Sequence, residues 1–317
     1  MSVPLTESQV RQWREEGYTL APDFLTPELL SEAVEAMSAA YPLSGNYKEE
    51  FGSDDKASFP SEKMPFINKV TTDEKLLNAT AQLLGTGDIQ LIQSLAWAKR
   101  GSMKTGNRLL NRDQRVHMDY GNNMWVHPPA WEAPNAVSVI IYYSDVTKTG
   151  GGTAVTPRKG RDDPLYKWPY QHMPGQNGLP FVNDREAAEE MMKEKDPEGW
   201  KLRQEAYARE IITSPTAGTV LFYRHDVWHR GTPVNVGTIR YVHNIAWVKR
   251  NSPGMCTWNA GYTKDMYYGW LEAFVRTLNG KQLRSLGWPA KDDPYWQLEA
   301  NRAAVKMRYG VDLYSRL

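Results

Sequence analysis

The sequence predicts a mainly β protein with flanking helices (α+β), in which the strands form an antiparallel sheet pair or jelly roll. Four runs rich in β-branched and aromatic residues follow residue 88, and each is bounded by Gly, Pro or Asp. They are IQLIQSLAWAKR at 89–100, AVSVIIYYSDV at 136–146, GTVLFYR at 218–224 and TIRYVHNIAWVKR at 238–250. No helical period separates most of these runs, which disfavours a design of alternating helices and parallel strands.

Helices are expected before this β region. Thr6 forms a capping-box pattern with Gln9, so a helix begins there, and Gly17 ends it. A second helix starts at Thr26, where a proline occupies the first helical position. A third helix spans 73–84 and is followed by a glycine.

The chain is predicted to form a single domain in three parts. They are residues 1–88 with N-terminal helices and a loop, residues 89–250 with the β core, and residues 251–317 with C-terminal helices. The loop, residues 41–68, is rich in Gly, Pro, Ser and charge and lies over the surface or over a site. Residues 158–210 interrupt the β core, and their highly charged portion predicts an exposed helical insertion.

Composition favours a small-molecule partner. The 38 basic and 37 acidic residues nearly cancel, so no global field draws the protein to nucleic acid or to an anionic membrane. The only cysteine, Cys256, excludes an intramolecular disulfide framework and a CxxC-type metal site. The N-terminus lacks a signal-peptide pattern, and no apolar run approaches the roughly 18 residues of a membrane span. A cytoplasmic location is therefore expected.

The motif RVHMDYG carries the first candidate metal ligands. On a strand, side chains alternate between faces, so His117 and Asp119 are predicted to project to the same side and to hold one ion together. This spacing alone is weak evidence, because a His-x-Asp pair arises readily by chance. Its companions further along the chain decide the interpretation.

His229 lies just past a predicted strand, and Arg240 follows on the next one. Two histidines and one carboxylate form the facial triad of non-haem Fe(II) enzymes, which leaves coordination positions open for a chelating co-substrate and O2. The planar fork of an arginine pairs with a carboxylate, as the distal end of 2-oxoglutarate requires. We therefore expect Fe(II) at His117, Asp119 and His229, and 2-oxoglutarate at Arg240.

The HMD motif, the segment GGTAVTPRKG and WHRGTPV followed by Arg240 together resemble the phytanoyl-CoA dioxygenase family of Fe(II)/2-oxoglutarate oxygenases. The resemblance covers roughly 89–250 and, more softly, the N-terminal helices. It implies a double-stranded β-helix (jelly roll, cupin-like) core and places the GGT residues, including Thr153, beside the co-substrate. Where family members often continue as PGSH, this chain has PRKG and a long insertion. The resemblance therefore does not imply which substrate the protein uses.

For each of four further residues, the sequence leaves two possible roles open. His225, four residues before His229, is either the alternative third ligand or a histidine that only makes a hydrogen bond. Gln93 is predicted to share a strand face with the apolar residues Leu91, Leu95 and Trp97. It either binds 2-oxoglutarate or substrate or makes a structural hydrogen bond. His127 is either structural or substrate-facing. Arg158, in a small basic cluster, either meets an anionic group of the substrate or lies in a solvated turn, the commoner place for such charges.

The resemblance implies that 2-oxoglutarate is decarboxylated to succinate and CO2 while a C–H bond of a small molecule is hydroxylated. Desaturation, cyclisation or epimerisation would use the same metal site with a different substrate placement. A redox-silent jelly-roll metal enzyme with zinc is a second class. Arg240 argues against it, because such an enzyme needs no anchor for a dicarboxylic acid. A binding module without catalysis is a third class, and it would bind no stoichiometric iron.

Overall fold

The structure is a computed structural model that describes residues 4–43, 57–59, 61, 63–101, 111, 113–167, 172–253, 270–277, 280, 283 and 288–317. Most of the predicted loop at 41–68 lies outside the described residues, as does Cys256.

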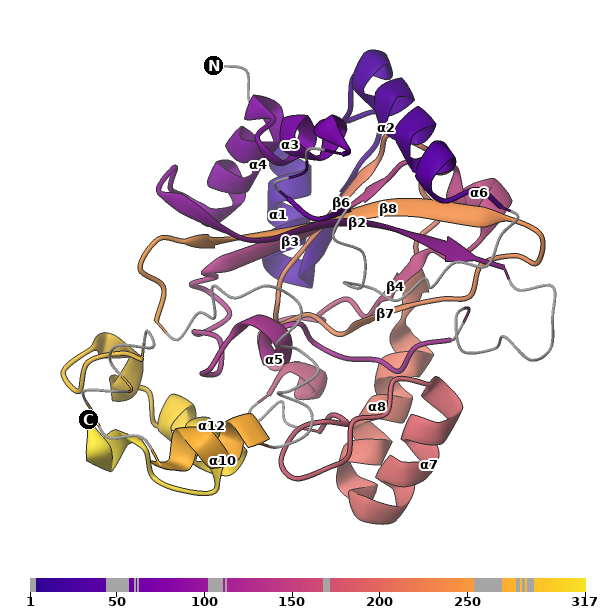
Figure 1. The fold of residues 1–317 in the computed structure, drawn as a ribbon. Coiled ribbons are helices and arrows are strands. Elements are labelled where there is room, and N and C mark those ends of the chain that lie inside the picture. The colour runs from indigo at the N-terminus through magenta and orange to yellow at the C-terminus, as the bar shows by residue number, and fades with distance from the viewer. Residues whose placement is uncertain are drawn as a thin grey trace.

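Two antiparallel sheets form the centre of the protein. The larger sheet has the order β1 (Tyr18–Ala21), β6 (Val220–Tyr223), β3 (Ala136–Tyr142), β8 (Ile239–Lys249) and β2 (Ile89–Arg100). The smaller has the order β5 (Ile211–Ile212), β4 (Thr153–Val155) and β7 (His229–Gly231). Figure 1 shows the larger sheet crossing the molecule, with β4 and β7 below it. The predicted antiparallel strands with flanking helices are confirmed.

The N-terminal helices cover the outer face of the larger sheet (Figure 1). They are α1 (Glu7–Glu16), α2 (Pro27–Ala40), α3 (Pro65–Thr71) and α4 (Glu74–Leu84). The predicted capping box is present, because the Gln9 backbone N–H donates to Thr6 Oγ1 and the Thr6 N–H donates to Gln9 Oε1 at 2.8 Å. Gly17 ends α1 with a φ of 95°, a left-handed conformation that favours glycine.

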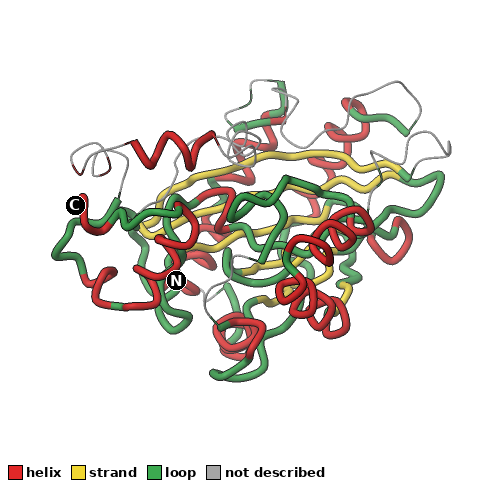
Figure 2. The backbone as a smooth tube through the Cα atoms, turned by 90° about the horizontal axis from the view of Figure 1, so that it is seen from below, coloured by secondary structure: helices red, strands yellow, loops and turns green. Residues whose placement is uncertain are grey.

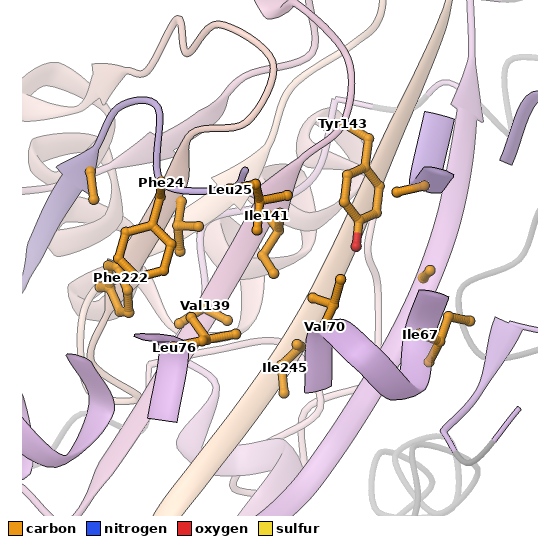
Figure 3. Close-up of a cluster of buried hydrophobic side chains, with 14 of the residues drawn as sticks. Phe24, Leu25, Ile67, Val70, Leu76, Val139, Ile141, Tyr143, Phe222 and Ile245 are labelled. Atoms are coloured by element: carbon orange, nitrogen blue, oxygen red, sulfur yellow. The ribbon is translucent and has the colours of Figure 1, made fainter. Parts of the chain in front are cut away.

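The core has two layers, one on each face of the larger sheet. All residues of β3 are buried, and alternate ones face opposite layers. Val139 and Ile141 belong to the layer that also contains Phe222 of β6 and Val70 of α3, as Figure 3 shows. Tyr142 instead faces the layer between the two sheets. This second layer holds the candidate site.

The insertion contains a short 3-10 turn, η3 (Pro164–Tyr166), and two helices, α7 (Arg185–Lys195) and α8 (Pro197–Arg209). Its predicted helical character is confirmed. The prediction that it is simply exposed is wrong for α8, because Arg203 and Tyr207 are buried. Their side chains turn inward, toward the segment that carries the HMD motif.

The remaining helices lie around this centre, and Figure 2 shows the strands together with helices outside them. They are α5 (Tyr120–Asn123), α6 (Val146–Thr149), α10 (Trp270–Thr277), η4 (Pro294–Gln297), α12 (Glu299–Tyr309) and η5 (Tyr314–Arg316). The C-terminal ones form a third apolar cluster with Trp125 and Val126. None of the described helices is long and apolar enough to span a membrane.

Candidate metal and co-substrate site

The HMD motif does not lie on a regular strand, which corrects the sequence-based expectation. His117 forms a single antiparallel bridge with His229, and each backbone N–H donates to the other's carbonyl at 2.9 Å. Asp119 instead caps α5 with a φ of −77° and a ψ of −13°. A helical turn therefore starts at the carboxylate, and the bridge brings the two histidines together.

The three predicted ligand residues meet at one point. Their ligand atoms all lie within 4.8 Å of one another, and no other residue of the described chain joins this group. Oδ1 of Asp119 is 3.6 Å from His117 Nε2 and 3.5 Å from His229 Nε2. The residues come from three places: the bridge at 117, the start of α5, and β7. The geometry fits a facial set of two imidazoles and one carboxylate.

Backbone carbonyls orient both imidazoles. Nδ1 of His117 lies 3.2 Å from the Arg115 carbonyl, and Nδ1 of His229 lies 3.1 Å from the Val227 carbonyl. A carbonyl can only accept, so Nδ1 carries the proton in each ring and Nε2 keeps its lone pair for a metal. Burial and the neighbouring His229 ring hold the pKa of His117 well below its usual value. The His117 ring is thus neutral at pH 7, as a metal ligand must be.

Asp119 is kept ionised by its surroundings. Burial by itself would raise the pKa of the carboxyl, but the nearby imidazoles and the Tyr223 hydroxyl outweigh burial and lower that pKa. The Tyr223 hydroxyl donates to Oδ2 at 2.7 Å. No local pattern singles out Tyr223, because its partner lies more than a hundred residues away.

Arg240 is buried, with 3% of its surface exposed. Its Nη1 donates to the Gly151 carbonyl, and its Cζ lies 5.1 Å from the centre of the Trp97 ring. Among the residues that the structure describes, no carboxylate lies within ion-pair distance of this guanidinium. A buried cation without an acidic partner is costly unless a ligand supplies the missing charge.

Lys99 is a second buried cation that sequence reasoning missed. It lies directly opposite Arg240 in the β2–β8 pair, and its Nζ donates to the Thr232 carbonyl at 3.0 Å. Burial and the neighbouring Arg240 lower the pKa of Lys99 to about 7. Only the strand register could have revealed this pair, because residues opposite each other in an antiparallel ladder share a face.

Thr153 lies close to Lys99 and Arg240, which together form the cationic end of the site. Its hydroxyl is 2.7 Å from the Tyr142 hydroxyl on β3, and the carbonyl of Gly151, two residues before Thr153, accepts from Arg240. Strand β4 begins at Thr153 and ends at Val155, which pairs with His229. β4 therefore connects the cationic end with the candidate metal ligands.

Gln93 faces the layer between the sheets, opposite Ala246. A bulge in β2 shifts the register between Leu91 and Gln93, and Leu91 pairs with Trp247 on the outer side. The expectation that Leu91 shares a face with Gln93 is therefore wrong.

His225 is also buried beside the site, but it does not belong to the ligand group. Neither of its ring nitrogens has a hydrogen-bond partner among the described residues. Its backbone carbonyl accepts from the Tyr120 N–H at 3.1 Å. The structure thus favours His229 over His225 as the third ligand.

The two predicted substrate residues lie in different surroundings. His127 is buried near Tyr120, with ring centres 5.1 Å apart, and its Nδ1 lies 2.9 Å from the Pro128 carbonyl. Arg158 is also buried, so the prediction that it lies in a solvated turn is wrong. Its Cζ lies 4.5 Å from the centre of the Trp131 ring. It lines a cavity of about 790 Å³ that none of the three candidate metal ligands lines.

The C-terminal part of the chain holds the segment that follows α5. The Arg308 guanidinium donates to the Met124 carbonyl at 2.7 Å, and the Tyr295 hydroxyl donates to the His127 carbonyl at 3.1 Å. These carbonyls are buried and need partners. The C-terminal helices therefore close one side of the region around α5.

The model of the phytanoyl-CoA dioxygenase family matches residues 13–241. The chain belongs to the phytanoyl-CoA dioxygenase family. This confirms the resemblance seen in the motifs, and the match includes His117, Asp119, His229 and Arg240. The C-terminal helices lie beyond the part that the family model covers. A search of curated proteins gave no significant match.

Solved structures with a similar fold include several 2-oxoglutarate-dependent enzymes. The carbocyclase SnoK from nogalamycin biosynthesis has a TM-score of 0.51 at 13% identity, over 80% of this chain and 88% of that one. EctD from S. alaskensis has a TM-score of 0.51 at 15% identity, over 80% of each chain. HygX from Streptomyces hygroscopicus, with nickel and 2-oxoglutarate bound, has a TM-score of 0.50 at 11% identity, over 78% and 88%. At these identities the likeness concerns the fold.

Proposed function

We propose that this member of the phytanoyl-CoA dioxygenase family is an Fe(II)- and 2-oxoglutarate-dependent dioxygenase that hydroxylates an unactivated C–H bond of a small organic molecule. Membership of the family supports the class of enzyme. The observation that carries the co-substrate assignment is Arg240, a buried guanidinium with no acidic partner among the described residues.

His117, Asp119 and His229 would hold the iron. Their Nε2 and Oδ1 atoms converge, both histidine rings have the tautomer that a ligand needs, and the carboxyl is ionised. Two nitrogen donors and one oxygen donor suit non-haem Fe(II) and leave room for exchangeable ligands. The donor set thus fits the metal.

Arg240 would pair with the distal carboxylate of 2-oxoglutarate, with Lys99 as a second cation and Thr153 as a hydroxyl partner. Arg240 lowers the pKa of Lys99, so the two cations repel each other, and a carboxylate paired with Arg240 would relieve this repulsion. β4 runs from Thr153 to the residue paired with His229, which suits a co-substrate whose other end reaches the metal.

When bound, iron supplies the oxidising chemistry of the family, in which 2-oxoglutarate, O2 and R–H give succinate, CO2 and R–OH. The protein's own part is to orient the reactants and to exclude bulk water. Tyr142 and Val242 line the layer between the sheets that would keep the site dry. Gln93 faces the same layer and is a candidate contact to the co-substrate or substrate. His127 and Arg158 stay weaker candidates for substrate binding.

A jelly-roll core fits the two antiparallel sheets, and it is the architecture that we propose for the strands. Desaturation, cyclisation or epimerisation remain alternative outcomes of the same site, and the similar folds include a carbocyclase and an epimerase. A redox-silent zinc enzyme is disfavoured by the cationic pair, which such an enzyme would not need.

The test is iron-dependent conversion of 2-oxoglutarate to succinate in air, beside a pool of candidate small molecules. The wild-type protein should form succinate only with Fe(II), and His229→Ala should form none. A true substrate accelerates the conversion and gains one oxygen atom in its mass spectrum. A product that has lost two hydrogens, or has an unchanged mass, would point to one of the alternative outcomes. Succinate formation that is equal with and without Fe(II) would contradict the proposal.

A further inference from the structure

The segment that carries His117 is bordered on one side by β7 and on the other by the insertion. On the first side, the His117 N–H donates to the His229 carbonyl at 2.9 Å. On the second side, the Arg115 N–H donates to the Asn183 carbonyl at 2.8 Å. Residues 113–117 thus take part of their support from the insertion rather than from a neighbouring strand.

The contact is closest at Val116, the residue before His117. Its backbone N–H donates to the Tyr207 hydroxyl at 2.9 Å, and its carbonyl accepts from Arg203 Nη1 at 3.0 Å. Both side chains come from α8. They replace the hydrogen bonds that a strand would otherwise give to this buried residue.

Glu189 on α7 fixes these two side chains in turn. Its Oε1 accepts from Arg203 Nε at 2.8 Å and from the Tyr207 hydroxyl at 2.9 Å. Arg203 is 1% exposed, so water does not compete for these bonds. Charge-assisted bonds in such a setting are stronger than those between neutral groups, and they limit the positions available to Val116.

We propose that Tyr207 and Arg203 are positioning residues of the metal site, which hold Val116 so that the adjacent His117 meets Asp119 and His229. The inference rests on the proposed metal site. Outer partners of metal ligands fix ligand orientation, and their loss weakens metal binding. The insertion is then a wall of the site rather than a solvated addition to it.

Tyr207→Phe tests this most cleanly. The ring keeps its packing against Arg185, whose Cζ lies 4.1 Å from the ring centre, while the Val116 N–H loses its acceptor. Met192→Ala is the matched control, because Met192 is buried on α7, and its loss loosens the helix pair without removing a hydrogen bond to Val116. Arg203→Lys is a second variant. It keeps the positive charge beside Glu189 but loses the planar guanidinium, which donates to Glu189 and to the Val116 carbonyl at the same time.

The probe is Co(II), whose visible absorption reports both affinity and ligand geometry, with melting temperatures measured in parallel. Tyr207→Phe and Arg203→Lys should raise the Co(II) Kd about tenfold and alter the visible bands, whereas Met192→Ala should lower Tm and change the Kd by less than about twofold. An unchanged Kd in folded Tyr207→Phe, or an equal rise in Met192→Ala, would overturn the inference.

The same titration separates this inference from the proposed function. Co(II) binding needs only the three ligands, so a wild-type protein that binds Co(II) but forms no iron-dependent succinate refutes the oxygenase and leaves the role of Tyr207 to be decided by its Kd. A wild-type protein that binds no Co(II) refutes both.

Discussion

The Tyr223 hydroxyl donates a 2.7 Å hydrogen bond to Oδ2 of Asp119. The other oxygen of the carboxylate, Oδ1, is thereby left facing His117 Nε2 and His229 Nε2 at 3.6 and 3.5 Å. Burial raises the pKa of Tyr223 well above its usual value, so the hydroxyl stays a donor at any pH near neutrality. One oxygen thus accepts from Tyr223, and the other lies beside the two imidazole nitrogens with which it would share a metal.

Tyr223→Phe should weaken metal binding without unfolding the protein. A hydrogen bond to a charged group contributes about 1.5–3 kcal/mol, and without it the carboxylate can rotate away from the two histidines. Anaerobic Fe(II) titration measures the effect. Tyr18→Phe serves as control, because Tyr18 lies opposite Tyr223 in the β1–β6 pair and its hydroxyl does not contact Asp119. Equal Fe(II) affinity in Tyr223→Phe and Tyr18→Phe would refute the role of this bond.

His229→Ala should abolish stoichiometric Fe(II) binding, whereas His225→Ala should keep most of it. Three ligands hold the ion, and the loss of one leaves an incomplete set of metal ligands. His225 is buried beside the site but lies outside the group of converging ligand atoms. Metal analysis after anaerobic purification of both variants decides the matter. Retention of iron by His229→Ala together with its loss from His225→Ala would reverse the ligand assignment.

Arg240→Ala should lower the affinity for 2-oxoglutarate by about 2–5 kcal/mol, because a carboxylate in a largely dry pocket loses its two-pronged partner. Iron binding should survive, since Arg240 is not among the converging ligands. Arg240→Lys should recover part of the affinity, because a point charge cannot reproduce two parallel hydrogen bonds. Calorimetric titration of 2-oxoglutarate checks this, and an unchanged Kd in a folded Arg240→Ala protein speaks for a purely structural arginine.

His243 makes folding stability depend on pH. It is fully buried, with Nε2 2.9 Å from the Ser94 hydroxyl and Nδ1 2.9 Å from the Tyr143 hydroxyl, and burial lowers its pKa to about 3. In the unfolded chain, His243 takes up a proton near pH 6.5. The stability that comes from burying the neutral ring is therefore fully present above that pH and is lost as the pH falls towards 3. At pH 5 the loss should be about 2 kcal/mol.

Urea unfolding at pH 7.5 and pH 5 measures this loss, with His243→Gln as the comparison. The variant should be less stable at pH 7.5, but its stability should fall less between the two pH values. Parallel losses in wild type and variant would show that other groups cause the pH dependence.

Much of the site could be predicted from local sequence. His117, Asp119 and His229 stand in short motifs, and the structure brings their ligand atoms together. The strand runs at 89–100 and 238–250 match β2 and β8 closely, because runs rich in β-branched and aromatic residues that end at turn residues are typical of strands. The capping box at Thr6 is likewise a purely local signal.

What could not be predicted depends on contacts between distant parts of the chain. Lys99 is placed beside Arg240 by the register of two long strands, and Tyr223 on β6 reaches Asp119 at the start of α5 only through tertiary packing. The bulge before Gln93 reverses the face of Leu91, and no single residue marks it. The charged composition of the insertion predicted an exposed helix, so it did not indicate that the Tyr207 hydroxyl accepts from Val116, the residue before His117. Such contacts follow from tertiary structure, which a local pattern does not encode.

The central claim is that one iron and one 2-oxoglutarate meet at the residues described above. Its most direct test is the visible spectrum of the anaerobic protein with Fe(II), before and after 2-oxoglutarate is added. We predict a charge-transfer band of the chelated keto acid that saturates at one equivalent and that is absent from His117→Ala. In Arg240→Ala, the band should need far more 2-oxoglutarate to appear. A wild-type protein that binds Fe(II) yet develops no such band at saturating 2-oxoglutarate would contradict the account.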